Sequence, residues 1–289
     1  MLEMIESSSP IPCGDDETEL HVLTGARDLD NCLWALKSFL TQSGRRMPIV
    51  FHSDGTLRED ETEWLSRHLP GCEIIDRVRA KEEIAEFLRP YPNLFYFRCT
   101  LEQIMFYKLV DFYFYSRTKR VLAIDSDIIW LKEPTQLNRC IDRGMGFFME
   151  GLRNAYAFDV DALRRYYGIR MRSRINAGLI HIPGPDAFNW DLLEYAASLS
   201  IKHQTDRKLG RGRWFEQTFF AVLFSVELER YERLDGQQYI IPASEATGDE
   251  DYTAVHCVTP KRELFRVFAE KGLQRNAFRE MFPAEILVA

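Results

Sequence analysis

The sequence predicts an α/β fold with a mixed, mostly parallel central sheet and helices on both faces. Strand-like and helix-like segments alternate along about the first hundred residues, which is typical of parallel strands connected by helices. Some of the strand-like segments are short, continuous apolar runs, such as 121-VLAI-124, and this pattern indicates strands that are covered on both faces. With 289 residues, 46% of them hydrophobic, the chain can bury a large core.

The first part of the chain follows a β-α-β-α-β-α order. A strand at 20–25 precedes a helix at 28–44, whose apolar residues recur at helical spacing and which ends at Gly44. The same patterns predict the following segments in order: a strand at 47–53, a helix near 57–69, a strand at 72–76, a helix near 80–88, a helix at 101–116 and the strand 121–124.

The second part of the chain is less regular, and it contains no internal repeat. Its apolar patterns predict strands at 145–150 and 178–183, followed by helices near 186–200, 214–226 and 260–279. The segment 244–252 is rich in acidic and small residues, so we expect it to be the most exposed loop.

Composition excludes several classes of protein. The net charge is 37 − 44 = −7, which argues against binding to nucleic acid or to an anionic membrane; the basic cluster 207–213 is a local exception. The six cysteines form no C-x-x-C pair, so neither a zinc knuckle nor a dense disulfide framework is indicated, and a cytoplasmic location is expected. No apolar run approaches the roughly 20 residues that a membrane span needs.

Two acidic residues, Asp125 and Asp127, interrupt the apolar run 121-VLAIDSDIIW-130. A carboxylate is costly to bury unless it meets a cation or several donors, so both acids are expected at a strand end that faces positive charge. A divalent cation bridging them to a diphosphate would explain the pair. Phosphoryl transfer to Asp125 would also explain it, as in haloacid-dehalogenase-type phosphatases, although their nucleophile usually ends the first strand. A third interpretation is that both acids only cap a turn.

Five segments resemble, in order, the landmarks of GT-A glycosyltransferases, a Rossmann-like class, and most closely the family 8 type that includes the glycogenins and bacterial galactosyl- and glucosyltransferases. They are 105-MFYKLVDFYF-114, 121-VLAIDSDIIWLKEP-134, 175-INAGLIHIP-183, 214-WFEQTFFA-221 and 256-HCVTPK-261. Each motif is short, so the ordered set is the specific part. The resemblance implies one domain at 1–289, with a flexible segment at 1–19, a nucleotide-binding half at 20–135, and an acceptor-binding half with a C-terminal helix at 136–289.

The resemblance also implies a metal site. In the family, the two acids hold Mn²⁺ (or Mg²⁺) against the sugar-nucleotide diphosphate and the first contacts the ribose, which points to Asp125 and Asp127. A late segment supplies a third ligand, here His256, and a lysine for the departing phosphate, here Lys261. Lys261 comes one residue earlier than in the common H-x-x-G-x-x-K-P-W form, and Arg262 replaces the proline. Taken alone, a single histidine is more often a core or surface residue than a ligand.

Further candidates follow from the same resemblance. Asn176 lies in a turn like the F-N-[AS]-G motif, whose asparagine binds the transferring sugar, and Glu216 and Gln217 lie where the family has Asp-Gln beside the reacting face. A turn before a strand would also explain Asn176, and a first-turn acid that favours the helix dipole would explain Glu216. The remaining donor-binding candidates are Thr24, Gly25, Ala26 and Arg27 under the base and ribose, Lys108, and Glu150 for sugar hydroxyls.

These features predict a metal-dependent transfer of a hexose from a nucleotide sugar, UDP-glucose or UDP-galactose, to a glycan, lipid-linked or protein acceptor, with retention. Glu216 as nucleophile and front-face attack without one are both open. The alternatives are the phosphatase and a catalytically silent nucleotide-sugar-binding protein, and a homodimer is one option for assembly. Basic and aromatic residues in 151–175 and 184–213 either meet a phosphorylated or acidic glycan or form a solvated basic face; they include Arg153, Tyr156, Arg164, Arg170 and Arg172.

Overall fold

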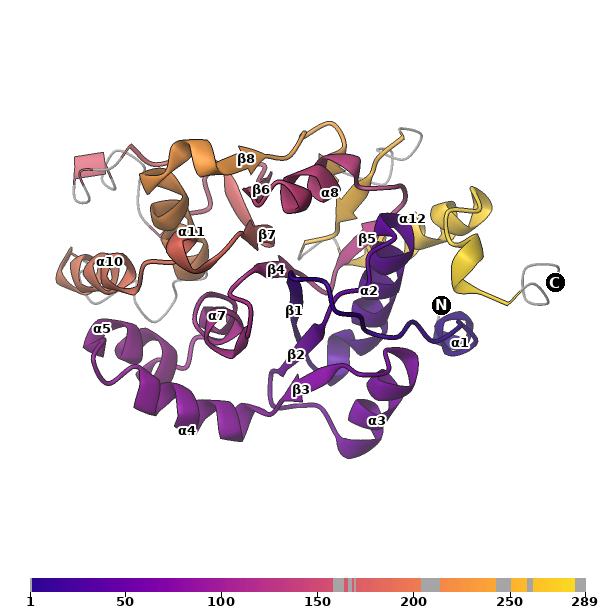
Figure 1. Cartoon of the computed structure of the whole chain (residues 1–289), viewed down its shortest axis with the longest axis horizontal. Helices are drawn as coiled ribbons and strands as arrows, with labels where there is room; N and C mark the ends of the chain where they lie inside the picture. Colours follow the sequence, from indigo (N-terminus) through magenta and orange to yellow (C-terminus); the bar gives the residue numbers. More distant parts are fainter. Residues whose placement is uncertain are drawn as a thin grey trace.

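The computed structural model describes residues 2–157, 164–165, 168, 170–203, 214–242, 251–258 and 262–283. Its main sheet has the strand order β3-β2-β1-β4-β7-β6-β8, which can be followed from bottom to top in Figure 1. The strands are β1 Glu19–Thr24, β2 Ile49–Ser53, β3 Glu73–Ile75, β4 Val121–Ile124, β6 Gly146–Glu150, β7 Ile175–Ile182 and β8 Tyr231–Arg233. Strands β3, β2, β1 and β4 are parallel, β7 is antiparallel to both of its neighbours, and β8 is parallel to β6. The expected mixed, mostly parallel sheet is confirmed.

A second, smaller sheet lies beside the end of β4. It contains β5 Ile128–Trp130, β10 Ala254–His256 and β9 Tyr239–Ile240, in the order β5-β10-β9. Strand β5 pairs with β10 in antiparallel register, with Ile128 opposite His256. Because β5 begins only a few residues after β4 ends, the turn between them joins the two sheets.

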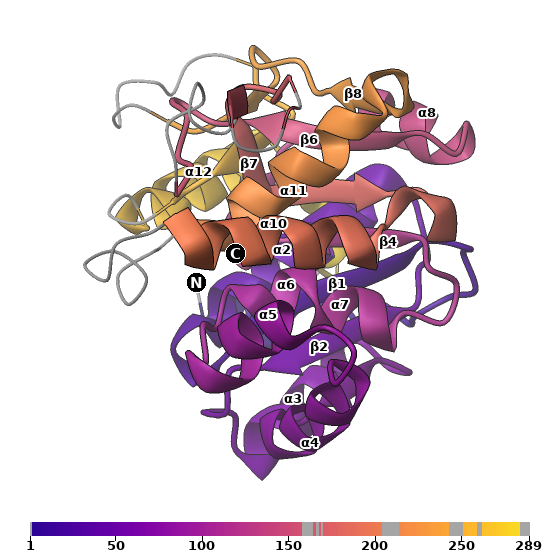
Figure 2. The same ribbon diagram turned by 90° about the vertical axis from the view of Figure 1, so that its left-hand side faces the viewer.

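Helices cover both faces of the main sheet, as Figures 1 and 2 show. The helices on one face are α2 Leu29–Ser43, α3 Glu59–His68 and α12 Glu263–Gln274, and those on the other are α4 Arg77–Phe87, α5 Pro92–Phe95, α6 Phe106–Leu109, α7 Asp111–Tyr115, α10 Trp190–His203 and α11 Phe215–Val226. Side chains alternate between the two apolar cores along β4, where Leu122 and Ile124 enter the first core and Val121 and Ala123 the second. Helix α8 Thr135–Asp142 packs beside β6.

The expected helix at 101–116 is broken into two short helices. Helix α6 ends at Leu109, α7 begins at Asp111, and residues 101–105 are not α-helical; Glu102 has a positive φ of 48°. Asp111 accepts two hydrogen bonds of 2.7 Å from the Arg98 guanidinium in a fully buried ion pair. A bidentate pair of this kind offsets the desolvation of both charges, and the chain bends to make it.

The N-terminal segment, for which flexibility at 1–19 is a prediction from the sequence, makes several contacts with the core. Residues Leu2–Glu6 form helix α1, and Ile5 and Ile11 are buried in the core beside α2. Buried Lys37 donates hydrogen bonds to Ser8 Oγ at 2.5 Å and to the Ser9 carbonyl at 2.8 Å. Two apolar side chains and a buried ammonium that needs acceptors therefore hold this segment in place.

Helix α2 ends as predicted at Gly44, which adopts the left-handed conformation (φ 68°) that favours glycine at a helix C-terminus. Within the described part of the chain, none of the helices has the length and apolar character that crossing a bilayer requires.

Candidate active site

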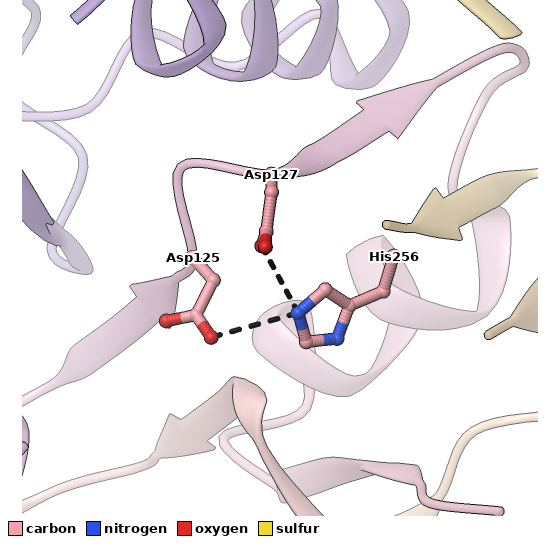
Figure 3. Close-up of side chains that lie close together, drawn as sticks. All are labelled: Asp125, Asp127 and His256. Atoms are coloured by element: carbon pink, nitrogen blue, oxygen red, sulfur yellow. Dashed lines mark ion pairs between the residues drawn. The ribbon is translucent and has the colours of Figure 1, made fainter. Parts of the chain in front are cut away.

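Asp125 and Asp127 lie in the turn between β4 and β5, and backbone hydrogen bonds fix this turn from both sides. The Asp125 amide donates to the Gly178 carbonyl of β7 at 2.8 Å, and the Cys257 amide donates to the Asp127 carbonyl at 2.8 Å. The pairing of β5 with β10 then brings His256 next to both acids, as Figure 3 shows. Three side chains from two sheets therefore meet at the carboxyl end of β4, as the sequence predicts for Asp125 and Asp127.

The three side chains form a compact cluster. His256 Nε2 lies 3.0 Å from Asp127 Oδ1 and 3.6 Å from Asp125 Oδ2 (Figure 3). One ligand atom from each residue can be chosen so that all lie within 4.8 Å of one another. Gly178 allows the close approach of β7, because a Cβ at this position would lie 2.1 Å from His256 Cε1. The glycine of the Asn-Ala-Gly turn is thus required by the histidine.

The chemistry of this cluster fits a divalent cation. An imidazole nitrogen that faces two carboxylate oxygens needs a positive charge between them, either a proton or a metal ion. Asp127 Oδ1 and His256 Nδ1 are both buried, and no described residue completes a hydrogen bond to either atom. Two carboxylates and an imidazole suit Mn²⁺, and they suit Mg²⁺ less well because of the nitrogen ligand.

Two cations flank the cluster. Lys108 is buried, and its Nζ lies 2.7 Å from Asp125 Oδ1; burial lowers the pKa of Lys108, but the nearby charges of Asp125, Glu216 and Asp127 outweigh burial and raise it. Arg262 forms an ion pair with Asp28, and its Nε lies 3.7 Å from Asp127 Oδ2. Burial raises the pKa of Asp127, yet His256, Arg262 and Lys108 reverse that effect and hold it below its usual range. The site therefore keeps its carboxylate ionised.

The two acids and the two flanking cations line a pocket at the carboxyl ends of β1, β2 and β4. Its wall comprises Leu23, Thr24, Gly25, Asp28, Asp54, Ile104, Met105, Lys108, Asp125, Ser126, Asp127 and Arg262. Of the four residues predicted at the end of β1, Thr24 and Gly25 belong to this wall. Ala26 and Arg27 are not among these lining residues. The Ala26 amide donates to Thr56 Oγ1 at 2.9 Å, and Arg27 is exposed.

Three residues of this wall were not among the candidates predicted from the sequence. Asp54 directly follows β2, so the rule that ligands meet strand carboxyl ends could have identified it. Asp28 lies in the short 3-10 turn after β1 and carried no separate signal. Arg262 appeared in the sequence only as a departure from the family motif, whereas the structure places it at the cluster. Lys261 lies outside the described residues.

The residues predicted beside the sugar lie on β7 and α11. Asn176 Oδ1 accepts a hydrogen bond from the Gly178 amide at 2.9 Å. Gln217 is engaged at both ends of its amide, since Oε1 accepts from the Ala177 amide at 3.2 Å and Nε2 donates to the Ala155 carbonyl at 2.7 Å. Gln217 therefore connects α11 to β7 and to the segment after β6, which is the role of a positioning residue.

Glu216 is 6% exposed and lies in the first turn of α11. Burial raises the pKa of its carboxyl group to about 7, although Lys108 and the backbone amides of Glu216 and Gln217 oppose this, and Asp125 adds to it. A carboxyl group with such a pKa beside a metal-ligand cluster is typical of functional sites.

Glu150 is not brought to the cluster. Glu150 is the last residue of β6. Its Oε1 forms ion pairs with Arg174 at 2.6 Å and with Arg233 at 3.0 Å, and the residue lines a separate pocket. Its predicted role toward the donor sugar consequently has no support from these contacts.

Comparison with known proteins supports the fold. No protein-family model and no curated protein matches the sequence. Mouse xyloside xylosyltransferase 1 matches in structure with a TM-score of 0.53 and 15% identity, over 87% of this chain and 99% of that one. The bifunctional glycosyltransferase WbbM matches with a TM-score of 0.56 and 11% identity, over 94% of this chain but only 53% of that one. The mannosyltransferase Ktr4p from S. cerevisiae, in complex with GDP, matches with a TM-score of 0.50 and 11% identity, over 93% of this chain and 85% of that one. The chain therefore has the GT-A fold that the sequence predicts, the fold of these solved glycosyltransferases.

Proposed function

We propose that the protein is a metal-dependent glycosyltransferase that transfers a hexose from a nucleotide sugar to a hydroxyl group of an acceptor. The observation that carries this proposal is the Asp125-Asp127-His256 cluster, which lies with Lys108 and Arg262 at the carboxyl end of β4. In α/β sheets this edge is where nucleotides bind. The fold is that of glycosyltransferases, one of which was solved with a nucleoside diphosphate.

Asp125, Asp127 and His256 would hold Mn²⁺ or Mg²⁺. When bound, such an ion supplies Lewis-acid stabilisation of negative charge on a diphosphate. Lys108 and Arg262 add two further positive charges at the same pocket, and they stabilise the nucleoside diphosphate as it leaves. Arg262 thereby takes the role of a phosphate-binding cation that the family resemblance implied for Lys261.

In the proposed reaction the bond between the anomeric carbon and the diphosphate oxygen breaks, and its electron pair leaves with the nucleoside diphosphate. The acceptor hydroxyl forms the new bond on the same face, so that configuration is retained, and its proton passes to the leaving phosphate. Glu216 faces this region with a carboxyl group whose pKa is about 7. A nucleophilic role and a charge-stabilising role are both open to its ionised form. Asn176 orients the sugar, and Gln217 holds the backbone on which Asn176 lies.

The finer assignments are part of the same proposal. The donor is UDP-glucose or UDP-galactose, and the acceptor is a glycan, free or attached to lipid or protein. A cytoplasmic location suits six cysteines that are all free thiols. A homodimer remains one option for assembly.

The experiment that tests this function is metal-dependent donor binding. In a thermal unfolding assay, a UDP-sugar at about 100 times its Kd should raise the free energy of unfolding by about 2.7 kcal/mol, and a chelator should abolish the gain. A panel of UDP-sugars with Mn²⁺ then identifies the donor, because slow transfer to water releases UDP. Release of inorganic phosphate from phosphomonoesters, without any response to nucleotide sugars, would instead establish the phosphatase. Stabilisation by a donor without any turnover would identify a silent binding protein.

A further inference from the structure

A second pocket lies along the same edge of the main sheet as the metal-ligand cluster. It is lined by Glu150, Gly151, Leu152, Arg174, Gly236, Gln237, Tyr239, Ile240, Ile241 and Tyr252. Glu150 ends β6, Arg233 ends β8, and Arg174 directly precedes β7. Strand β6 is separated from β4 by β7 alone (Figure 1), and the Glu150 end reaches further along β7 than the end of β4 does, because Glu150 pairs with Ile175 and Ile124 pairs with Leu179.

Two arginines share one carboxylate at this pocket. Arg174 and Arg233 both form ion pairs with the same atom, Glu150 Oε1, at 2.6 and 3.0 Å. Each guanidinium carries five N–H donors, and each of these ion pairs uses a single nitrogen. Arg172 lies close enough that the charge of Arg233, in addition to burial, lowers its pKa. Asp235, the nearby acid on the other side, is exposed, and its carboxylate accepts a hydrogen bond from the Gln237 amide. Within the cluster of Glu150, Arg174 and Arg233, one positive charge is therefore left over.

The local backbone sets the position of Arg174. Arg174 has a positive φ of 55°, which is unfavourable for a residue with a side chain. Its backbone is fixed by two hydrogen bonds, from the Gly151 amide to the Arg174 carbonyl at 2.6 Å and from the Arg174 amide to Asn154 Oδ1 at 2.7 Å. Backbone strain that is maintained by the surroundings is concentrated at functional sites. Glu150 Oε1 occupies one nitrogen of each guanidinium, so it is the carboxylate with which a bound anion would compete.

The other side of the pocket is formed by core residues. Tyr239 and Tyr252 are 3% exposed and form part of its wall, together with the apolar side chains of Ile240 and Ile241. Strand β9, which carries Tyr239 and Ile240, belongs to the same small sheet as β10, which carries His256. Strand β10 in turn pairs with β5, which directly follows Asp127, so the small sheet connects the wall of this pocket to the metal-ligand cluster.

We propose that this pocket binds an anionic substituent, a carboxylate or phosphate, of the acceptor glycan through Arg174 and Arg233. This inference rests on the proposed function, because it assumes a glycosyltransferase and specifies that its acceptor is acidic and binds at the same edge of the sheet as the donor. A planar guanidinium pairs with carboxylate and phosphate through two parallel hydrogen bonds. The sideways spacing of two strands is already about 10 Å, and Glu150 also lies further along β7 than the end of β4, so the anion belongs to a part of the substrates more distant than the diphosphate.

The first experiment measures binding without turnover. Methyl β-glucuronide is the acidic probe and methyl β-glucoside is the neutral one. Each probe is titrated, in the presence of UDP and Mn²⁺, into the wild type, the Arg174→Gln/Arg233→Gln double variant and an Arg79→Gln control. Arg79 is an exposed arginine of α4 that is paired with Glu83. The wild type and the control should bind the acidic probe at least about 10-fold more tightly than the neutral one, and the double variant should lose this preference. Equal affinity of the wild type for both probes, or a preference that survives in the double variant, would overturn the proposal.

A second variant guards against a simple folding defect. Glu150→Gln keeps the shape of the side chain but removes the competing carboxylate, so it should bind the acidic probe more tightly than the wild type does. Weaker binding of that probe would refute the role given to both arginines.

Donor binding separates this inference from the proposed function. Wild-type protein that binds UDP with Mn²⁺ but shows no preference for the acidic probe refutes the anion pocket alone. Protein that prefers the acidic probe but ignores UDP refutes the glycosyltransferase and leaves an anion-binding site. If the double variant instead loses affinity for UDP-glucuronate relative to UDP-glucose, with acceptor probes unaffected, the anion lies on the donor and the acceptor assignment is wrong.

Discussion

Replacement of Glu216 by glutamine should stabilise the protein and inactivate it at the same time. Burial raises the pKa of Glu216 from an ordinary value of 4.5 to about 7. One pKa unit corresponds to 1.36 kcal/mol, so keeping this carboxylate ionised in the folded state costs about 3 kcal/mol. Glutamine has the same shape and no charge, and it removes that cost.

The sign of the pH dependence follows from proton linkage. Between pH 4.5 and about 7 the folded protein holds the Glu216 proton more tightly than the unfolded chain does. The contribution of this group to the free energy of unfolding therefore falls as pH rises through that range, and it stays low above it. Glu216→Gln should melt like the wild type below this range. At pH 8 it should melt about 6 °C higher, at roughly 2 °C per kcal/mol for a chain of this size.

The effect on turnover should have the opposite direction. If the carboxylate acts at the anomeric carbon, Glu216→Gln should lower kcat at least about 10²-fold, or roughly 2.7 kcal/mol of barrier, with nearly unchanged KM for the donor. Wild-type kcat/KM should rise as pH increases through about 7, because only the ionised carboxyl group acts. Glu227→Gln is the matched control, since Glu227 is an exposed acid at the other end of α11 and pairs with Arg230.

Two results would refute this reasoning in different ways. A Glu216→Gln variant that melts several degrees below the wild type at pH 8 and keeps full turnover would show that the acid stabilises the first turn of α11. A variant that melts higher and still turns over normally would confirm the cost of burial, and it would leave front-face attack without an enzyme carboxylate as the mechanism.

Three further predictions concern the cations of the site. Asp127→Asn should reduce Mn²⁺-dependent UDP affinity at least about 10²-fold. The fold should be kept, because Asp127 bonds to the Cys257 amide through its backbone carbonyl, which the substitution does not change. Unchanged affinity in calorimetry would rule out the metal site. In the wild type, Mn²⁺ binding should weaken as pH falls into the range where imidazole is protonated. The His256→Ala variant should bind Mn²⁺ weakly and without that pH dependence. Identical pH profiles of the two proteins would exclude His256 as a ligand. Arg262→Gln should weaken UDP binding about 10-fold both with and without Mn²⁺. Arg266→Gln is the control and should leave UDP binding unchanged, because Arg266 is an exposed residue of α12 that is paired with Glu270. Equal effects of both substitutions would show that UDP responds only to the net charge of the protein.

Local patterns were sufficient for most elements of the fold. The strand at 47–53 and the helix at 28–44 were predictable because apolar spacing and the terminal Gly44 are properties of neighbouring residues. The break within 101–116 was not predictable in this way. It depends on the buried pair between Arg98 and Asp111, and nothing in the spacing of the surrounding aromatic residues reveals that pair.

The candidate site shows the same division. Asp125 and Asp127 were recognisable because acids in an apolar run are costly unless they have a function. His256 was identified only through its place after the other motifs. Asp54 was missed although it follows a predicted strand, and Glu150, which was expected at the donor, is held by Arg174 and Arg233.

The sequence by itself determined the class of fold, the order of its strands and helices along the chain, and the position of the two acids at a strand end. The reason is that hydrophobic period and the cost of burying charge are local properties. The tertiary structure alone decided which distant groups meet these acids. The pairing of β5 with β10 places His256 beside Asp127, the placement of α6 brings Lys108 to Asp125, and the packing of α11 buries Glu216 and raises its pKa. Such contacts join residues far apart in the chain, and their geometry depends on strand pairing and on core packing rather than on any local pattern.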